Sequence, residues 1–175
     1  MYTGEATTLV TLLTSDLGLV QARAQSLRNS GAKLASSLAT LTESSVILVR
    51  GKEGWRATGA VLEENWFMRL PSVTSQETVA RVSGLLLRLV AGEAQDVELF
   101  PLMKNFLEAL ATFPSDLHEG VEILTVLQIL QALGLDAGEI PGDTTTITEP
   151  FIHTLLENRV QYVARINTGI AASGL

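Results

Sequence analysis

The glycine-lysine turn in "VILVRGKEGWRATGAVLEENW", residues 46–66, is the stretch of this chain most suited to chemistry. Such a turn can cradle a phosphate, form the tip of a β-hairpin or contact a nucleic-acid backbone. A P-loop needs four residues between its glycines and then Lys with Ser or Thr, because the hydroxyl must hold magnesium. Here Glu53 follows Lys52 and would repel a phosphate. The flanking pattern predicts strand–turn–strand, so GKEG is expected to be a hairpin tip.

Residue types that support catalysis or metal binding are scarce. The chain has no cysteine, which removes thiol nucleophiles and cysteine-based zinc sites. His118 and His153 are the two histidines, and neither has a partner at metal-ligand spacing, so we expect both to face solvent on helices. Glu63 and Glu64 are adjacent and would point to opposite faces of a strand, which makes them a poor acid–base pair. The sequence therefore favours a protein that is not an enzyme and that holds no metal or cofactor.

Basic side chains beside a tryptophan remain as a candidate site. On a small β-barrel, basic side chains can follow phosphates while an aromatic ring stacks on a base, an arrangement suited to single-stranded nucleic acid. The pattern leaves two alternatives open, namely DNA contacts or ordinary surface charges around a tryptophan packed in the core. The candidate residues are Arg23, Arg28, Lys33, Arg50, Lys52, Trp55 and Arg56.

The first part of the chain has the pattern of β-strands. Residues 6–14 are rich in Thr, Val and Leu, and "SDLG" follows them as a turn signal. Residues 19–28 alternate between polar and small apolar side chains, which predicts a strand with one buried face. A short helical turn is expected near 33–39, and two further strands flank GKEG. Four strands at this spacing predict a small antiparallel barrel or sheet.

After Pro71 the hydrophobic period becomes helical. Thr74 followed by Glu77 is a capping box, which predicts a helix start. A second helix is expected near 96–111, and a third, opened by Asp116 and Glu119, has a core "VEILTVLQILQAL" that is apolar on nearly all sides. Such a helix belongs in the middle of a bundle. A last helix opens at Thr148 with Pro150 in its first turn and continues to Ile170.

The charge distribution differs between the two parts. Residues 1–70 carry seven basic and six acidic side chains, a net charge of +1, whereas residues 71–175 carry five and thirteen, a net charge of −8. This asymmetry indicates either different partners for the two parts or an acidic helical surface that aids solubility. No apolar run approaches the ~18 residues that a membrane span needs, and the start lacks the order of a signal peptide. We therefore expect a cytoplasmic protein with no membrane partner.

Residues 4–66 resemble the N-terminal OB-fold domain of RecO, a family of bacterial recombination mediators. The helical stretches "VSGLLLRLVAGEAQDVELFPLMKNFLEALA" and "ILQALGLDAGEIPG" are similar to that family's C-terminal α-helical domain. The resemblance implies an α+β fold, with an OB-like barrel over 1–70 and an all-α domain over 71–175. The chain has a shortened N-terminus relative to the family, which leaves open whether the barrel's first strand is present. It also lacks the family's four-cysteine zinc site. The matching positions are Gly4-Glu5, Leu9 to Thr14, Leu17-Gly18, Lys33-Leu34 and the hairpin from Arg50 to Arg56.

The resemblance also implies a role and partners. RecO proteins bind single- and double-stranded DNA, anneal complementary strands and help to load the RecA recombinase onto DNA coated by single-strand binding protein. They act with RecR and contact the acidic C-terminal tail of the single-strand binding protein. DNA binding carries over to the basic positions Arg23, Arg28, Lys33, Arg50, Lys52 and Arg56. Docking of an acidic tail on the helical part would use a basic spot such as Arg159 and Arg165.

A second class of function is kept beside this one. If the barrel is degenerate, the acidic helical surface becomes the working part and the chain is a non-catalytic protein–protein adaptor. A DNA-binding assay separates the two, because phosphate contacts make affinity fall steeply with salt.

Overall fold

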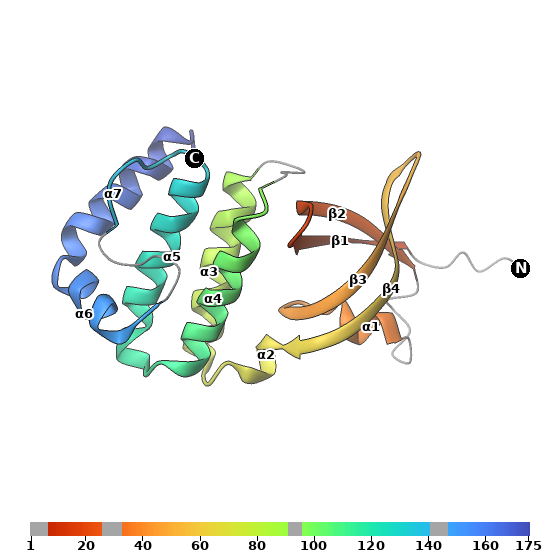
Figure 1. Ribbon diagram of the computed structural model, residues 1–175, viewed down its shortest axis with the longest axis horizontal. Helices are drawn as coiled ribbons and strands as arrows, with labels where there is room; N and C mark the ends of the chain where they lie inside the picture. The colour runs from red at the N-terminus through yellow and green to blue at the C-terminus, as the bar shows by residue number, and fades with distance from the viewer. Residues whose placement is uncertain (1–6, 26–32, 91–95, 141–146) are drawn as a thin grey trace, which may run out of the picture. The chain divides into compact units, whose positions relative to one another are not determined.

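The computed structural model describes residues 7–25, 33–90, 96–140 and 147–175 (Figure 1). The chain divides into two compact units, one containing the described residues up to Arg69 and the other containing those from Leu70 onward. Whether each unit is a separate domain, as predicted for 1–70 and 71–175, stays a prediction.

The first unit is built from two β-hairpins. Strands β1 (Thr7–Thr14) and β2 (Gly18–Gln25) pair antiparallel, and so do β3 (Thr42–Gly51) and β4 (Gly54–Asn65). Both hairpins lie where the sequence predicts them. The two hairpins join through β2 and β4, which gives one sheet with the order β1-β2-β4-β3.

The predicted barrel is only partly matched by this sheet. The α+β class is confirmed, but β2 and β4 pair in parallel, so the wholly antiparallel pairing is wrong. The four described strands form an open sheet in which β1 and β3 are the edges. Each hairpin is fixed by its local turn, whereas the β2–β4 pairing joins residues that are more than 30 positions apart, for example Ala22 with Trp55. A short-range pattern in the sequence carries no signal for such a pairing.

One face of the sheet holds the core of the first unit. Ala22, Ala24 and Ala57 are buried there, and the short helix α1 (Lys33–Ser37) packs against them through its Leu34. Small residues suit this position because they let a helix approach the strands closely. The opposite face, called the outer face here, carries exposed residues from all four strands. They are Leu9, Arg23, Ile47, Val49, Arg56 and Val61.

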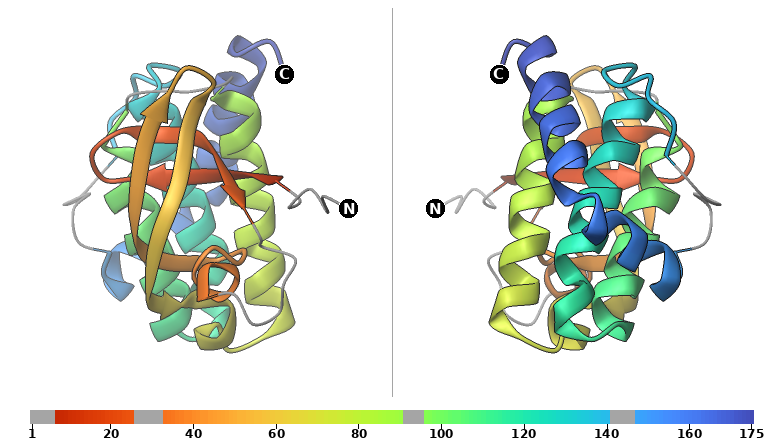
Figure 2. Two further views of the ribbon diagram at one scale, coloured as in Figure 1. Left: turned by 90° about the vertical axis from the view of Figure 1, so that its right-hand side faces the viewer. Right: turned by 90° about the vertical axis from the view of Figure 1, so that its left-hand side faces the viewer.

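The second unit is a helical bundle around α5 (His118–Ala132). This helix contacts α3 (Val73–Leu89), α4 (Leu99–Thr112), α6 (Glu149–Glu157) and α7 (Arg159–Ala172), and Figure 2 shows it among them. It is buried on nearly every side, so the prediction of a helix in the middle of a bundle is confirmed. None of the helices in the described residues is both long and apolar enough to span a membrane.

The starts of two helices differ from the prediction. The N-cap of α3 is Ser72, whose Oγ accepts a hydrogen bond from the Ser75 amide at 3.1 Å, so the predicted capping box of Thr74 and Glu77 is wrong by two residues. Ser72 has the extended backbone that an N-cap requires, while Thr74 lies within the first turn. Before α5, the 3-10 helix η1 (Ser115–Leu117) takes up Asp116, one of the two residues predicted to open this helix, while Glu119 lies in the first turn of α5.

The last helix and the end of β4 also depart from the sequence pattern. The predicted helix starts after Thr148, with a proline in its first turn as expected, but it breaks into α6 and α7 at Asn158. The Asn158 amide donates to the Thr154 carbonyl at 3.0 Å, and this side-chain bond accompanies a local departure from helical geometry. A short helix, α2 (Trp66–Arg69), follows β4 and was not predicted.

Candidate nucleic-acid interface

A row of paired residues crosses the outer face of the sheet. Leu9 on β1 is the register partner of Arg23 on β2, Arg23 of Arg56 on β4, and Arg56 of Val49 on β3. Two guanidinium groups therefore come from directly opposed positions on neighbouring strands. Like charges placed opposite each other in a sheet are destabilising. An anion seated over this row would offset that repulsion, so the geometry suits a phosphate.

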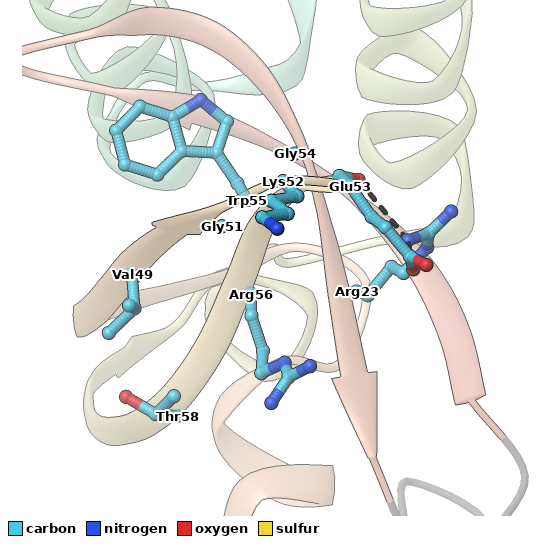
Figure 3. Close-up of a pocket in the computed structure, with 9 residues that line it drawn as sticks. All are labelled: Arg23, Val49, Gly51, Lys52, Glu53, Gly54, Trp55, Arg56 and Thr58. Atoms are coloured by element: carbon cyan, nitrogen blue, oxygen red, sulfur yellow. Dashed lines mark hydrogen bonds and ion pairs between the residues drawn. The ribbon is translucent and has the colours of Figure 1, made fainter.

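The two arginines of the row differ in what holds them. The Nη1 of Arg23 donates to a carboxylate oxygen of Glu53 at 2.5 Å and to the Glu53 carbonyl at 3.1 Å. Figure 3 shows this contact, in which the tip of the β3–β4 hairpin leans over β2. Arg56 makes no hydrogen bond or ion pair with another described residue, and its side chain is exposed. Arg56 is therefore the row's freely available cation.

The GKEG turn is a hairpin tip, as predicted. Lys52 and Glu53 form the turn between β3 and β4, and Gly54 takes a φ of +96°, which favours glycine because it has no Cβ. Lys52 is exposed and makes no ion pair with the other described residues. The tip therefore presents one available cation beside one carboxylate that is already engaged.

Arg50 and Trp55 lie on the other face of the same hairpin. They are register partners, and the Arg50 guanidinium lies 5.0 Å from the centre of the indole ring. Trp55 is partly buried and packs against the alanine core of the first unit. Figure 3 shows its ring projecting away from Arg56. The predicted DNA-binding set is therefore split between two faces, and Trp55 has a clear packing role.

Two further predicted DNA contacts cannot be placed. Arg28 lies outside the described residues. Lys33 is the first residue of α1, but its side chain is outside what the structure describes. Both stay predictions.

The two arginines predicted to bind a partner are engaged within the helical unit. Arg159 pairs with Glu119, and Arg165 pairs with Asp136 and donates to the Glu139 carbonyl at 2.9 Å. The Arg165 guanidinium is partly buried and also lies beside the ring of Tyr162. These contacts give the partly buried Arg165 a structural role, whereas the Arg159 pair is exposed and contributes little to stability. The predicted partner role of both arginines stays a prediction.

The prediction that both histidines face solvent is wrong for one of them. His118 is buried rather than solvent-facing: its Nε2 lies 3.0 Å from the Phe113 carbonyl and its Nδ1 3.5 Å from the Ser75 hydroxyl. The 3-10 turn before α5 places the His118 ring inward, between α3 and the end of α4. His153 is exposed, as expected. Across the described residues no three His, Cys, Asp or Glu side chains gather into a metal-binding group.

Exposed aliphatic side chains on the outer face accompany the arginines, and the predicted site did not include them. Val49, Leu9 and Ile47 are 51%, 58% and 64% exposed, and they surround the arginine row. The alternation in "VILVR" contained this signal, because Ile47 and Val49 fall on one face while Val46 and Leu48 fall on the other. The combination of exposed aliphatic and cationic groups suits a ligand with both apolar faces and negative charge, as unpaired nucleotides have.

Comparison with known proteins points in the same direction. No protein-family model matches the chain. A protein of Heliobacterium modesticaldum named DNA repair protein RecO is 31% identical over 144 residues, which is 78% of this chain. A protein of the same name from Dehalococcoides mccartyi is 34% identical over 107 residues, or 61% of the chain. The chain is RecO-like.

The similarity to RecO is limited by length. The aligned residues make up 51% of the Heliobacterium RecO and 42% of the Dehalococcoides RecO. The chain thus spans about half the length of the curated relatives that it matches.

Proposed function

We propose that this RecO-like chain binds DNA through the outer face of its sheet and acts in recombinational DNA repair. In this role it would assist the annealing of complementary strands and the loading of a recombinase. The observation that carries the proposal is the cross-strand row in which Arg23 and Arg56 are direct neighbours among exposed aliphatic side chains. The similarity to DNA repair proteins named RecO supports the same role. The proposal assigns no chemical step to the chain.

The OB assignment belongs to this proposal. An OB-fold is a five-stranded, partly open barrel whose sheet face and loops bind oligonucleotides. The four described strands would supply four of its five, and the outer face would be the binding face. Both single- and double-stranded DNA are proposed ligands, with the aliphatic side chains favouring unpaired bases.

The proposal also includes two protein partners. RecR and the acidic tail of the single-strand binding protein are the partners that the resemblance implies, and a cytoplasmic location goes with them. Within the helical unit an apolar hollow between α3, α5 and α7, lined by Leu85, Ile123 and Ile166, lies beside Arg88. Arg88 is exposed and has no hydrogen bond or ion pair among the residues described. The carboxylates of Glu119 and Glu122 also line the hollow, but each is paired with an arginine, Arg159 and Arg81 respectively. Arg88 is therefore the cation of this hollow that an acidic tail would contact.

An annealing assay tests the proposed role. Two complementary oligonucleotides, one carrying a fluorescence donor and the other an acceptor, are mixed with and without the protein. The wild type should accelerate annealing, Arg56→Ala should reduce the acceleration, and Arg88→Ala should leave it unchanged, since it removes the same charge from the helical unit. An acceleration that is lost equally in both variants would contradict a specific role of the outer face. No acceleration by the wild type, together with no DNA binding, would favour the adaptor instead.

A further inference from the structure

Glu53 is the unusual residue of the candidate interface. It is an acidic side chain at the tip of the β3–β4 hairpin, where the nearest charged residues along the chain, Arg50, Lys52 and Arg56, are basic, and its side chain is 83% exposed. It nevertheless contacts Arg23, which is 46% exposed, through both its carboxylate and its backbone carbonyl. All of the recorded bonds of Arg23 go to this one residue and use the same nitrogen, Nη1.

An exposed ion pair of this kind contributes little to stability. It does change what Arg23 offers to a ligand, because Glu53 takes up Nη1 and places a negative charge beside the guanidinium. The neighbouring Arg56 has no such partner among the described residues. A phosphate that approaches this pair of arginines therefore meets the available Arg56, the engaged Arg23 and the negative charge of Glu53.

We propose that Glu53 is an internal competitor for the phosphate at Arg23, so that DNA gains the full contact with this arginine only when it displaces the Glu53 carboxylate. The backbone carbonyl contact of Arg23 is independent of the Glu53 side chain and can keep the hairpin tip in place after displacement. Glu53 thus lowers the affinity for DNA and makes the dependence of affinity on salt less steep. This inference rests on the proposed function, because it presupposes that the outer face binds DNA.

The test is Glu53→Gln in the full chain, with binding of labelled oligothymidine measured by fluorescence anisotropy at several salt concentrations. Glutamine keeps an acceptor for Arg23 but removes the competing charge. Affinity at low salt should rise about fourfold, the effect expected from removing one negative charge ~5 Å from a phosphate in water. The plot of log affinity against log salt concentration should steepen by about 0.7, because one more phosphate contact becomes fully effective.

A structural role for Glu53 predicts the opposite sign. If the carboxylate only holds the hairpin, Glu53→Gln will weaken binding or leave it unchanged, and either result overturns the proposal. Glu63→Gln is the matched control: Glu63 is an exposed carboxylate on β4 whose recorded bond goes to the Ser45 hydroxyl, and its substitution should not tighten binding. In an Arg23→Ala background, the gain in affinity from Glu53→Gln should shrink to less than about twofold. Without Arg23 there is no guanidinium for which Glu53 and the phosphate compete.

Failure of the inference can be told apart from failure of the proposed function. If the wild type binds DNA and Glu53→Gln shows no gain in affinity, Glu53 is not a competitor, while the proposed DNA-binding function stands. An absence of binding in the wild type and in Glu53→Gln rejects both. Equal gains from Glu53→Gln and Glu63→Gln would reduce the effect to net charge and overturn the inference.

Discussion

The division of the hairpin into two faces leads to a prediction that compares Arg56 with Arg50. Both are exposed arginines near the same turn, and removing either lowers the net charge equally. Arg56 lies on the outer face beside Arg23, whereas Arg50 lies on the other face against Trp55. If the outer face binds DNA, Arg56→Ala should weaken binding much more than Arg50→Ala.

The size of the loss follows from counterion release. A single phosphate contact contributes a slope of about 0.7 in log affinity against log salt for single strands. We assume that the contact contributes nothing to affinity near ~1 M salt. Arg56→Ala should then lower the affinity about eightfold at ~50 mM salt and about threefold at ~200 mM. Arg50→Ala should change affinity by less than about twofold but lower the free energy of unfolding by ~0.5–1 kcal/mol, because its contact with the indole is lost.

Fluorescence anisotropy with a labelled single-stranded oligonucleotide measures the affinities, and chemical denaturation measures the stabilities. Arg56→Ala should not lower stability, since the Arg56 side chain has no hydrogen bond or ion pair within the described residues and its removal relieves the repulsion with Arg23. Equal losses of affinity in the two variants would refute the division into faces. A larger loss in Arg50→Ala would place the binding surface on the side of Trp55.

Two predictions concern the elements that hold the site and the bundle in place. Gly54→Ala should destabilise the protein by ~1–2 kcal/mol through backbone strain alone. The φ of Gly54 is +96°, and nothing lies within 4 Å of an added Cβ. An unchanged denaturation midpoint would contradict the strained turn. Gly120→Ala should destabilise the helical unit by about 1–3 kcal/mol, because the added methyl collides with Ile152 of α6. A calorimetric transition identical to that of the wild type would show that α6 does not pack on α5 this closely.

Much of the local structure could be predicted from the sequence because its causes are local. Alternation in residues 19–25 indicated which side of β2 is buried, and the turn residues before Gly18 and Gly54 indicated both hairpins. The apolar circumference of α5 indicated its central position. These features depend on neighbours a few positions away, which a single sequence displays directly.

The candidate site could be predicted only in part, because it depends on pairing between distant strands. The parallel register that puts Arg23 beside Arg56 has no short-range signal. The separation of Trp55 from Arg56 is visible in the sequence, since adjacent residues of a strand face opposite ways, so the predicted DNA-binding set combines residues of both faces. The inward turn of His118 depends on its contacts with Ser75 and Phe113, and the first of these comes from a different helix.

The most direct test of the central claim is a titration of single-stranded DNA with the wild-type protein at low and at high salt. The account predicts binding at low salt that falls along a straight line in log affinity against log salt concentration. With Arg56 and Lys52 as the fully available contacts, and Arg23 still engaged by Glu53, that line should have a slope of about −1.4. Absence of binding at low ionic strength, or an affinity that does not change with salt, would contradict the assignment of this RecO-like chain as a DNA-binding protein.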